Sequence, residues 1–230
     1  MGIFDSFKKS NSGNNPKTAE QRKKQTEKYL KSLNIPFVDH LPLIEEESEV
    51  KIRNAKEIAE RILVLVYLTY TSEDPDEREN VIDFLKTNSL WDKVSPDEKE
   101  LFQKENLTDQ EIANVSWRPE AVWLLLWTIN KVDKLKLPTD QIEIKEIVKR
   151  LPKFLTSPKE FIDNAIVRQT PEILDVSDLI YRLHWAARNA DLTNKQMPAN
   201  LNLSIVLERH YAINWVTFYA EEWDDISTDT

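Results

Sequence analysis

The sequence predicts a mainly α-helical protein, and three observations lead to this fold class. Both glycines, Gly2 and Gly13, lie near the N-terminus, so residues 14–230 contain none. Residue pairs with the spacing of helix caps recur along the chain, and apolar residues recur at helical intervals. Because tight β-hairpins use glycine in their turns, its absence argues against a sheet built from hairpins. We expect one multi-helix domain of about nine helices, with at most one or two short strands near residues 36–53.

The N-terminal part of the chain changes composition near residue 17. Residues 1–16 are polar and are expected to form a flexible tail, and residues 17–230 to form a single helical domain. The basic stretch 18–33 predicts the first helix of that domain. Residues 36–53 contain two prolines and one short alternating piece, which indicates an extended connection.

Cap signals place the starts of several helices that follow. In a capping box, the side chain of the first residue accepts a hydrogen bond from the backbone N–H three residues later. The side chain of the acid at that later position accepts one from the backbone N–H of the first residue. The pairs with this spacing are Asn54–Glu57, Ser95–Glu98, Thr108–Glu111 and Ser157–Glu160. The other expected helices span residues 76–88, 118–135 and 143–150. Since glycine is missing, the turns between helices must use other residues, and we expect Asn34, Asn88, Asn106 and Asn194 among them.

Two C-terminal helices, at residues 171–190 and 204–220, carry an unusual mixture of charged and aromatic side chains. On the first, small apolar residues gather on one side, and charged residues, Tyr181 and Trp185 lie on the other. On the second, apolar residues point in nearly every direction, which indicates an enclosed helix. Charges on such a helix are partly buried and need partners, so we expect a polar network between these two helices.

This network, or a site beside it, contains the candidate functional residues. They are Asp178, Arg182, His184, Trp185, Glu208, Arg209, His210, Asn214, Trp215, Trp223 and Asp224. Asp178 and Arg182 are four residues apart on one helix and are expected to form an ion pair. The Asp178 face is expected to neutralise Glu208 and Arg209 as well, which predicts that Arg182 and Glu208 are energetically coupled.

Five segments in order carry a resemblance to a known family. They are RNAKEIAERILVLVYL (53–68), WRPEAVWLLLWTINKV (117–132), EILDVSDLIYRLHWAARNADL (172–192), VLERHYAINWV (206–216) and WDDISTDT (223–230). With them the chain resembles the domain-of-unknown-function 4272 family. Ile213 stands where that family's pattern has leucine, which is a conservative change. The resemblance implies no activity.

Composition excludes several classes of protein. With no cysteine, the chain has no disulfide, no thiolate nucleophile and no cysteine-ligated metal. Without glycine after residue 13 it also lacks the phosphate-binding loops and the nucleophile elbow. Residues 1–33 carry eight Lys and Arg against three acids, and the rest of the chain carries 23 against 37. A body this acidic disfavours nucleic acid and leaves a basic protein partner open. No apolar run approaches the roughly 20 residues of a membrane span, so we expect a cytoplasmic protein.

The candidate residues indicate no specific chemistry. Glu208 and His210 diverge by about 200° on one helix and cannot bind the same ion, so we expect no metal and no cofactor. Histidines hydrogen-bonded between helices are the simpler interpretation. We therefore interpret the chain as a helical binding or interaction module. The alternatives are a hydrolase-like enzyme with its site between helices 171–190 and 204–220, and an acidic antitoxin- or immunity-like protein that masks a basic partner.

Overall fold

The computed structural model describes residues 17–230, and within them the mainly α-helical fold is confirmed. The longer helices are α2 (Ala19–Ser32), α3 (Ala55–Glu73), α4 (Arg78–Thr87), α7 (Arg118–Thr128), α10 (Thr170–Leu192) and α11 (Leu203–Val216). The shorter ones are α5 (Pro96–Gln103), α6 (Asp109–Val115), α8 (Ile144–Val148) and α9 (Lys159–Asp163). The described part of the chain contains no strand, and residues 36–53 form an extended connection with turns. The predicted flexible tail, residues 1–16, lies outside the described residues.

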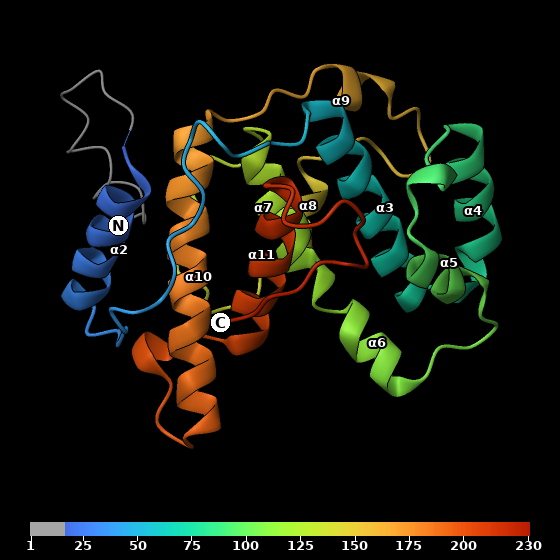
Figure 1. The fold of residues 1–230 in the computed structure, drawn as a ribbon. Coiled ribbons are helices and arrows are strands. Elements are labelled where there is room, and N and C mark those ends of the chain that lie inside the picture. The colour runs from blue at the N-terminus through green and yellow to red at the C-terminus, as the bar shows by residue number, and fades with distance from the viewer. Residues whose placement is uncertain (1–16) are drawn as a thin grey trace.

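The helices that form the centre of the molecule pack in the order α2, α10, α11, α7, α3 (Figure 1). Helices α4, α5, α6 and α9 also pack against α3. The main apolar core lies between α3, α7 and α11. A second, smaller core lies between α2 and α10 and contains Leu30, Leu179 and Leu183. Helix α11 is therefore enclosed by α10 on one side and α7 on the other, as its apolar pattern predicts.

The predicted capping boxes form at three of the four positions. The side chains of Asn54, Ser95 and Thr108 each accept the N–H of the glutamate three residues later. The side chain of that glutamate accepts the backbone N–H of the cap residue. The expectation for Ser157 is wrong, because Pro158 already has helical backbone angles and is itself the N-cap of α9. The Ser157 hydroxyl accepts only the N–H of Lys159, at 3.4 Å.

Five helices end in the same way although no glycine is available. After α2, α4, α7, α10 and α11 one residue has a positive φ. The N–H of the residue that follows it donates to the carbonyl five positions before that donor. This is the Schellman motif, which usually places glycine at the positive φ. The residues that replace it are Asn34, Ser89, Asn130, Asn194 and Phe218, with φ between 51° and 60°. Asn34, Asn88 and Asn194 lie in turns after helices, as expected, and Asn106 lies in a bend between α5 and α6. In the turn after α4, Asn88 has a negative φ of −96° and its neighbour Ser89 has the positive φ.

Two helices end four or more residues before the sequence predicts. The helix expected at 118–135 ends at Thr128 because Asn130 terminates it, although apolar residues continue beyond that point. The helix expected at 204–220 ends at Val216. Its C-terminal turn is made by Phe218 at φ 56°, a conformation that costs a bulky residue roughly 1–2 kcal/mol. The Arg53 guanidinium lies 4.1 Å from the Phe218 ring centroid and holds this turn against the start of α3.

Candidate functional site

The candidate residues do not form one network. Because α11 lies between α10 and α7, successive residues of α11 reach different neighbours. Glu208 and Arg209 bind side chains of α7, whereas His210 contacts α10. The expectation that the Asp178 face neutralises Glu208 and Arg209 is therefore wrong. Most of the candidate residues divide into an α10 ion pair, an α7–α11 charge cluster, a histidine pair and the contacts of a docked C-terminal segment.

The ion pair of α10 is fully buried. Arg182 donates from Nε and Nη2 to the Asp178 carboxylate, at 2.8–3.1 Å, and both side chains have no exposed surface. Arg182 also donates to the Pro42 carbonyl at 3.2 Å. A second pair lies one turn away, where Arg22 of α2 donates to Asp175 at 3.0 Å. These pairs join α10 to α2 and to the extended connection, so they hold the small second core together.

The α7–α11 charge cluster consists of two ion pairs. Arg209 donates to Glu120 from Nε and Nη2 at 3.0 and 2.8 Å, and Glu120 is fully buried. Arg118 binds Glu208 at 3.1 Å beside it, where burial raises the pKa of Glu208 above its usual range despite the neighbouring guanidinium. All four charges are paired, so the cluster fixes α11 against α7 and presents no free charge to a ligand.

The two histidines of the C-terminal helices form a buried pair. His184 Nδ1 of α10 and His210 Nδ1 of α11 are 2.9 Å apart, and both rings are almost fully buried. One Nδ1 must donate and the other accept, so the neutral pair shares one proton between these two atoms. Burial lowers the pKa of His184 to about 4, with a smaller effect from Arg188. Burial and the neighbouring His184 lower the pKa of His210 to about 3.

The histidine pair makes stability depend on pH. In the unfolded chain both rings protonate near pH 6.5, but in the folded chain they do so only near pH 4 and 3. The unfolded state therefore binds more protons between these values, and stability falls as the pH falls. We expect urea unfolding to show a loss of about 2–4 kcal/mol between about pH 7 and pH 5. The variant His184→Leu/His210→Phe should lose most of this dependence; an unchanged slope would contradict the assignment.

A pocket opens beside the histidine pair. It has a volume of about 280 Å³ and lies between α10, α11, the extended connection and the C-terminal segment. Its lining residues are Pro42, Leu43, Ile44, Glu45, Ser177, Tyr181, His210, Asn214, Thr217, Tyr219 and Asp229. We call it the His210 pocket. Of the candidate residues only His210 and Asn214 line it, and the Tyr181 ring lies 5.8 Å from the His210 ring.

A second pocket, of about 390 Å³, lies between the start of α3, the start of α5 and the C-terminal segment. We call it the Arg53 pocket, and it contains the candidate residues Trp215 and Trp223. The Arg53 guanidinium lies 4.2 Å from the Trp215 ring centroid and donates to three backbone carbonyls. Arg61 is paired with Glu98 at 2.7 Å. Arg53 is thus engaged in holding the C-terminal segment, and Arg61 is engaged with α5.

The residues after α11 are docked on the helices. Tyr211 donates to the Trp223 carbonyl, Asn214 donates to the Ser227 carbonyl at 2.9 Å, and the Trp223 ring is buried. Asp224 accepts the N–H of Asp97 in the first turn of α5, at 3.0 Å. The docked segment forms one wall of each of the two pockets.

Replacing Asp224 by alanine is expected to destabilise the protein by about 0.5–2 kcal/mol, as loss of a helix cap does. The carboxylate bonds the backbone of α5, although its repulsion raises the pKa of Asp97 and offsets part of the benefit. Asp225→Ala is the matched control because Asp225 is exposed. Urea unfolding should separate the two variants; equal stability would show that Asp224 does not hold the segment.

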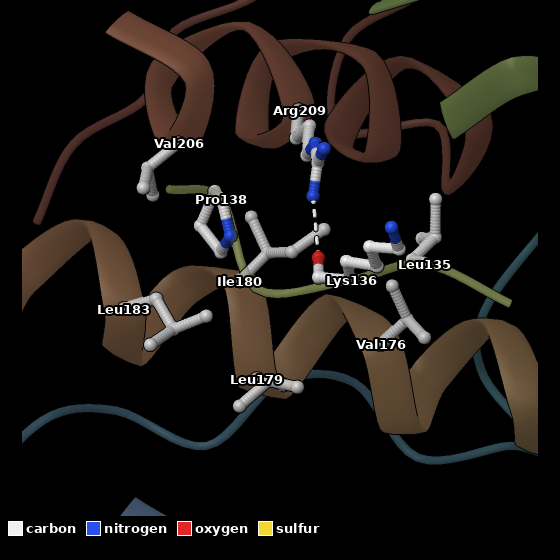
Figure 2. A pocket seen from close by; sticks show the side chains of 9 residues that line it. All are labelled: Leu135, Lys136, Pro138, Val176, Leu179, Ile180, Leu183, Val206 and Arg209. Carbon is white, nitrogen blue, oxygen red and sulfur yellow. Dashed lines mark hydrogen bonds between the residues drawn. The ribbon is translucent and has the colours of Figure 1, made fainter. Parts of the chain in front are cut away.

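A third cavity lies deeper between α10 and α11. It is lined mainly by apolar residues, four of them from α10, and has a volume of about 20 Å³, enough for about one water molecule. Figure 2 shows Arg209 reaching across it from α11 to donate to the Lys136 carbonyl, at 2.8 Å. A cavity this small holds no organic ligand, so it belongs to the packing.

Several residues that build these sites were not among the candidates. They are Arg53, Arg61 and Glu98 around the Arg53 pocket, Arg118 and Glu120 of α7, and Arg22 and Asp175 between α2 and α10. Glu120 has a signal in the sequence, because it is a lone acid at the start of an apolar run. Trp185 was a candidate but packs against the second core between α2 and α10.

Two further properties bear on function. Within residues 17–230, no three His, Asp or Glu side chains are grouped so that they could hold a metal ion. None of the helices described is both long enough and apolar enough to cross a membrane.

Comparison with known proteins identifies the family of this chain. Residues 22–226 match the family model described as "Domain of unknown function (DUF4272)". Searches of curated proteins and of solved structures give no match.

Proposed function

Because this chain belongs to the DUF4272 family, which has no assigned activity, we propose a function from its geometry: it is a helical binding module whose ligand site is the His210 pocket. One observation carries the proposal. Hydrogen-bonding side chains of α10 and α11 converge in this pocket with apolar residues of the extended connection. Its volume, about 280 Å³, is near the lower end of small-molecule sites, about 300 Å³.

The bonding of the lining residues supports a site for a ligand. His210 uses Nδ1 for His184, and Asn214 uses Nδ2 for Ser227, so His210 Nε2 and Asn214 Oδ1 are left for a ligand. Both side chains are held by these bonds, and both lie on a helix enclosed by its neighbours. Such preorganisation favours binding because little side-chain entropy is lost.

A hydrolase with its site between α10 and α11 has less support. Ser177 and His210 line the same pocket, as a nucleophile and its base would. However, His210 Nδ1 meets another histidine instead of an orienting carboxylate. Its pKa, lowered to about 3 by burial, also makes His210 a poor base near neutral pH.

An immunity-like role, in which acidic residues mask a basic partner, also has less support. The exposed acids Glu221 and Glu222 of the C-terminal segment lie in the Arg53 pocket beside Lys93 and Lys99. Charges of both signs therefore mix at this surface, whereas a masking surface needs one contiguous sign.

The binding function is tested by screening small fragments against protein labelled with ¹⁵N-histidine. The chain has three histidines, and His40 is exposed and outside the pocket, so it serves as an internal control. Fragments that enter the pocket should shift the imidazole signals of His210 and, through the shared proton, of His184. The His40 signals should stay in place. A screen in which no fragment shifts His210 would overturn the proposal.

Variants locate the binding within the molecule. Ser177→Leu fills the pocket and should abolish the shifts, whereas Ser116→Leu, at an exposed position outside the pocket, should leave them intact. Urea unfolding of both variants establishes that each is folded at the temperature of the screen. Shifts that persist in Ser177→Leu would place the binding elsewhere.

A further inference from the structure

The charge around the His210 pocket restricts the ligand it can take. Glu45 and Asp229 are exposed carboxylates of its lining, and none of the eleven lining residues is a lysine or an arginine. Arg182 lies near Tyr181, with its Cζ 5.9 Å from the ring centroid, but it is neutralised by Asp178. The two carboxylates of the lining therefore repel a ligand with negative charge and attract a cation.

The uncharged groups inside the pocket act in the same direction. His210 Nε2 and Asn214 Oδ1 are the atoms not engaged by His184 and Ser227, and both can accept a hydrogen bond. The rings of Tyr181 and Tyr219 line the same space, and a cation near the face of an aromatic ring is stabilised. Leu43 and Ile44 add an apolar strip on the side of the extended connection.

We propose that the ligand of the His210 pocket carries an alkylammonium group, an inference that rests on the binding function proposed above. The ammonium has three donors and no acceptor, so it matches a pocket that offers acceptors and carboxylates. Its alkyl chain packs against Leu43 and Ile44. When the ammonium donates to His210 Nε2, the proton of His210 must sit on Nδ1, which then donates to His184 Nδ1. Binding thereby selects one of the two tautomers of the histidine pair.

Two sources supply this chemistry. One is a small free amine, and the other is a lysine side chain of a partner protein. Both place the same ammonium in the pocket, but a lysine also brings a backbone that contacts the rim. The rim residues Leu43 and Tyr219, which are about half exposed, are available for such contacts.

The experiment compares short alkyl probes whose polar groups differ in charge. n-Butylammonium, n-butanol and butyrate are titrated into ¹⁵N-histidine-labelled full-length protein at constant ionic strength. An N-acetylated, C-amidated tripeptide Gly-Lys-Gly represents the protein source. The ¹⁵N shifts report which ring nitrogen carries the proton, which a general salt effect does not change. Probes of about five non-hydrogen atoms are expected to bind with millimolar dissociation constants.

We expect n-butylammonium to shift His210 toward the Nδ1–H tautomer and to bind at least about threefold more tightly than butanol, with no shift from butyrate. A tripeptide that binds more tightly than n-butylammonium indicates the protein source, and one that binds no better indicates a free amine. If butanol or butyrate shifts His210 as strongly as n-butylammonium, the inference is wrong but the binding function stands. If neither these probes nor any fragment shifts His210, both fail.

Charge-neutral variants provide the second measurement. Glu45→Gln/Asp229→Asn should weaken n-butylammonium binding by about threefold and leave butanol binding unchanged. Glu49→Gln is the matched control, since Glu49 is an exposed acid of the same connection outside the pocket. Both sites are exposed, so these variants are expected to fold. Equal affinity of n-butylammonium for the double variant and the unmodified protein would overturn the role of the carboxylates.

Discussion

Replacing Glu120 by alanine is expected to lower the free energy of unfolding by about 3–5 kcal/mol, the cost of removing one partner from a buried ion pair. Glu120 has no exposed surface and accepts two hydrogen bonds from Arg209 and one from the N–H of Ile142, at 2.6 Å. Alanine would leave the Arg209 guanidinium buried with only the Lys136 carbonyl as partner. Urea unfolding near neutral pH measures the loss.

Two controls test whether the loss of stability comes from leaving a charge buried without its partner. Glu20→Ala breaks the Glu20–Lys24 pair of α2, whose side chains are 65% and 70% exposed, and should leave stability unchanged within error. Glu120→Leu/Arg209→Met removes both buried charges and should cost less than Glu120→Ala alone. If Glu120→Ala is as stable as the parent protein, the Glu120–Arg209 pair is hydrated in solution.

Local signals along the sequence predict much of the fold. The capping boxes at Asn54, Ser95 and Thr108 depend on residues three apart, so no knowledge of the tertiary structure is needed to find them. Helix ends are harder to predict without glycine. Asn34 and Asn194 are recognisable because asparagine tolerates positive φ, but Phe218 gives no such signal. That turn is held by tertiary contacts with Arg53, which a local pattern does not contain.

The partners of the buried charges could not be predicted in the same way. A helical wheel gives the direction of Glu208 and Arg209 relative to their own helix, but not which helix lies opposite. The ion pair within α10 follows from a spacing of four residues, and it forms. The pairs of Arg209 with Glu120 and of Glu208 with Arg118 join residues about ninety positions apart. They depend on the packing order α10, α11, α7, which only the structure supplies.

The two pockets depend on the C-terminal segment for the same reason. Trp223 indicates docking, but the carbonyls of Trp223 and Ser227 make two of the segment's contacts. Backbone groups carry no residue identity, so their bonds to Tyr211 and Asn214 are invisible in the sequence. The His210 pocket therefore could not be outlined from the candidate residues, of which it contains two.

Replacing Asp178 by alanine is expected to cost about 3–5 kcal/mol, because it leaves the fully buried Arg182 with the Pro42 carbonyl as its remaining partner. Arg182→Ala should cost less than Asp178→Ala. Nη1 of Arg182 already has no hydrogen-bond partner among the described residues, so removing the side chain also removes that unsatisfied group. The double variant should lose less than the sum of the two single losses, since the partners contact each other directly.

A second cycle tests whether the buried charges act as separate pairs. Arg182→Ala combined with Glu208→Ala is expected to be additive within about 0.5 kcal/mol, because Glu208 is paired with Arg118 and not with the α10 ion pair. Urea unfolding of the parent, the single variants and the double variants supplies both cycles under one condition. A coupling energy well above that value between Arg182 and Glu208 would mean that charge interactions run through α11 from one face to the other. The division of the candidate residues into separate clusters would then be wrong.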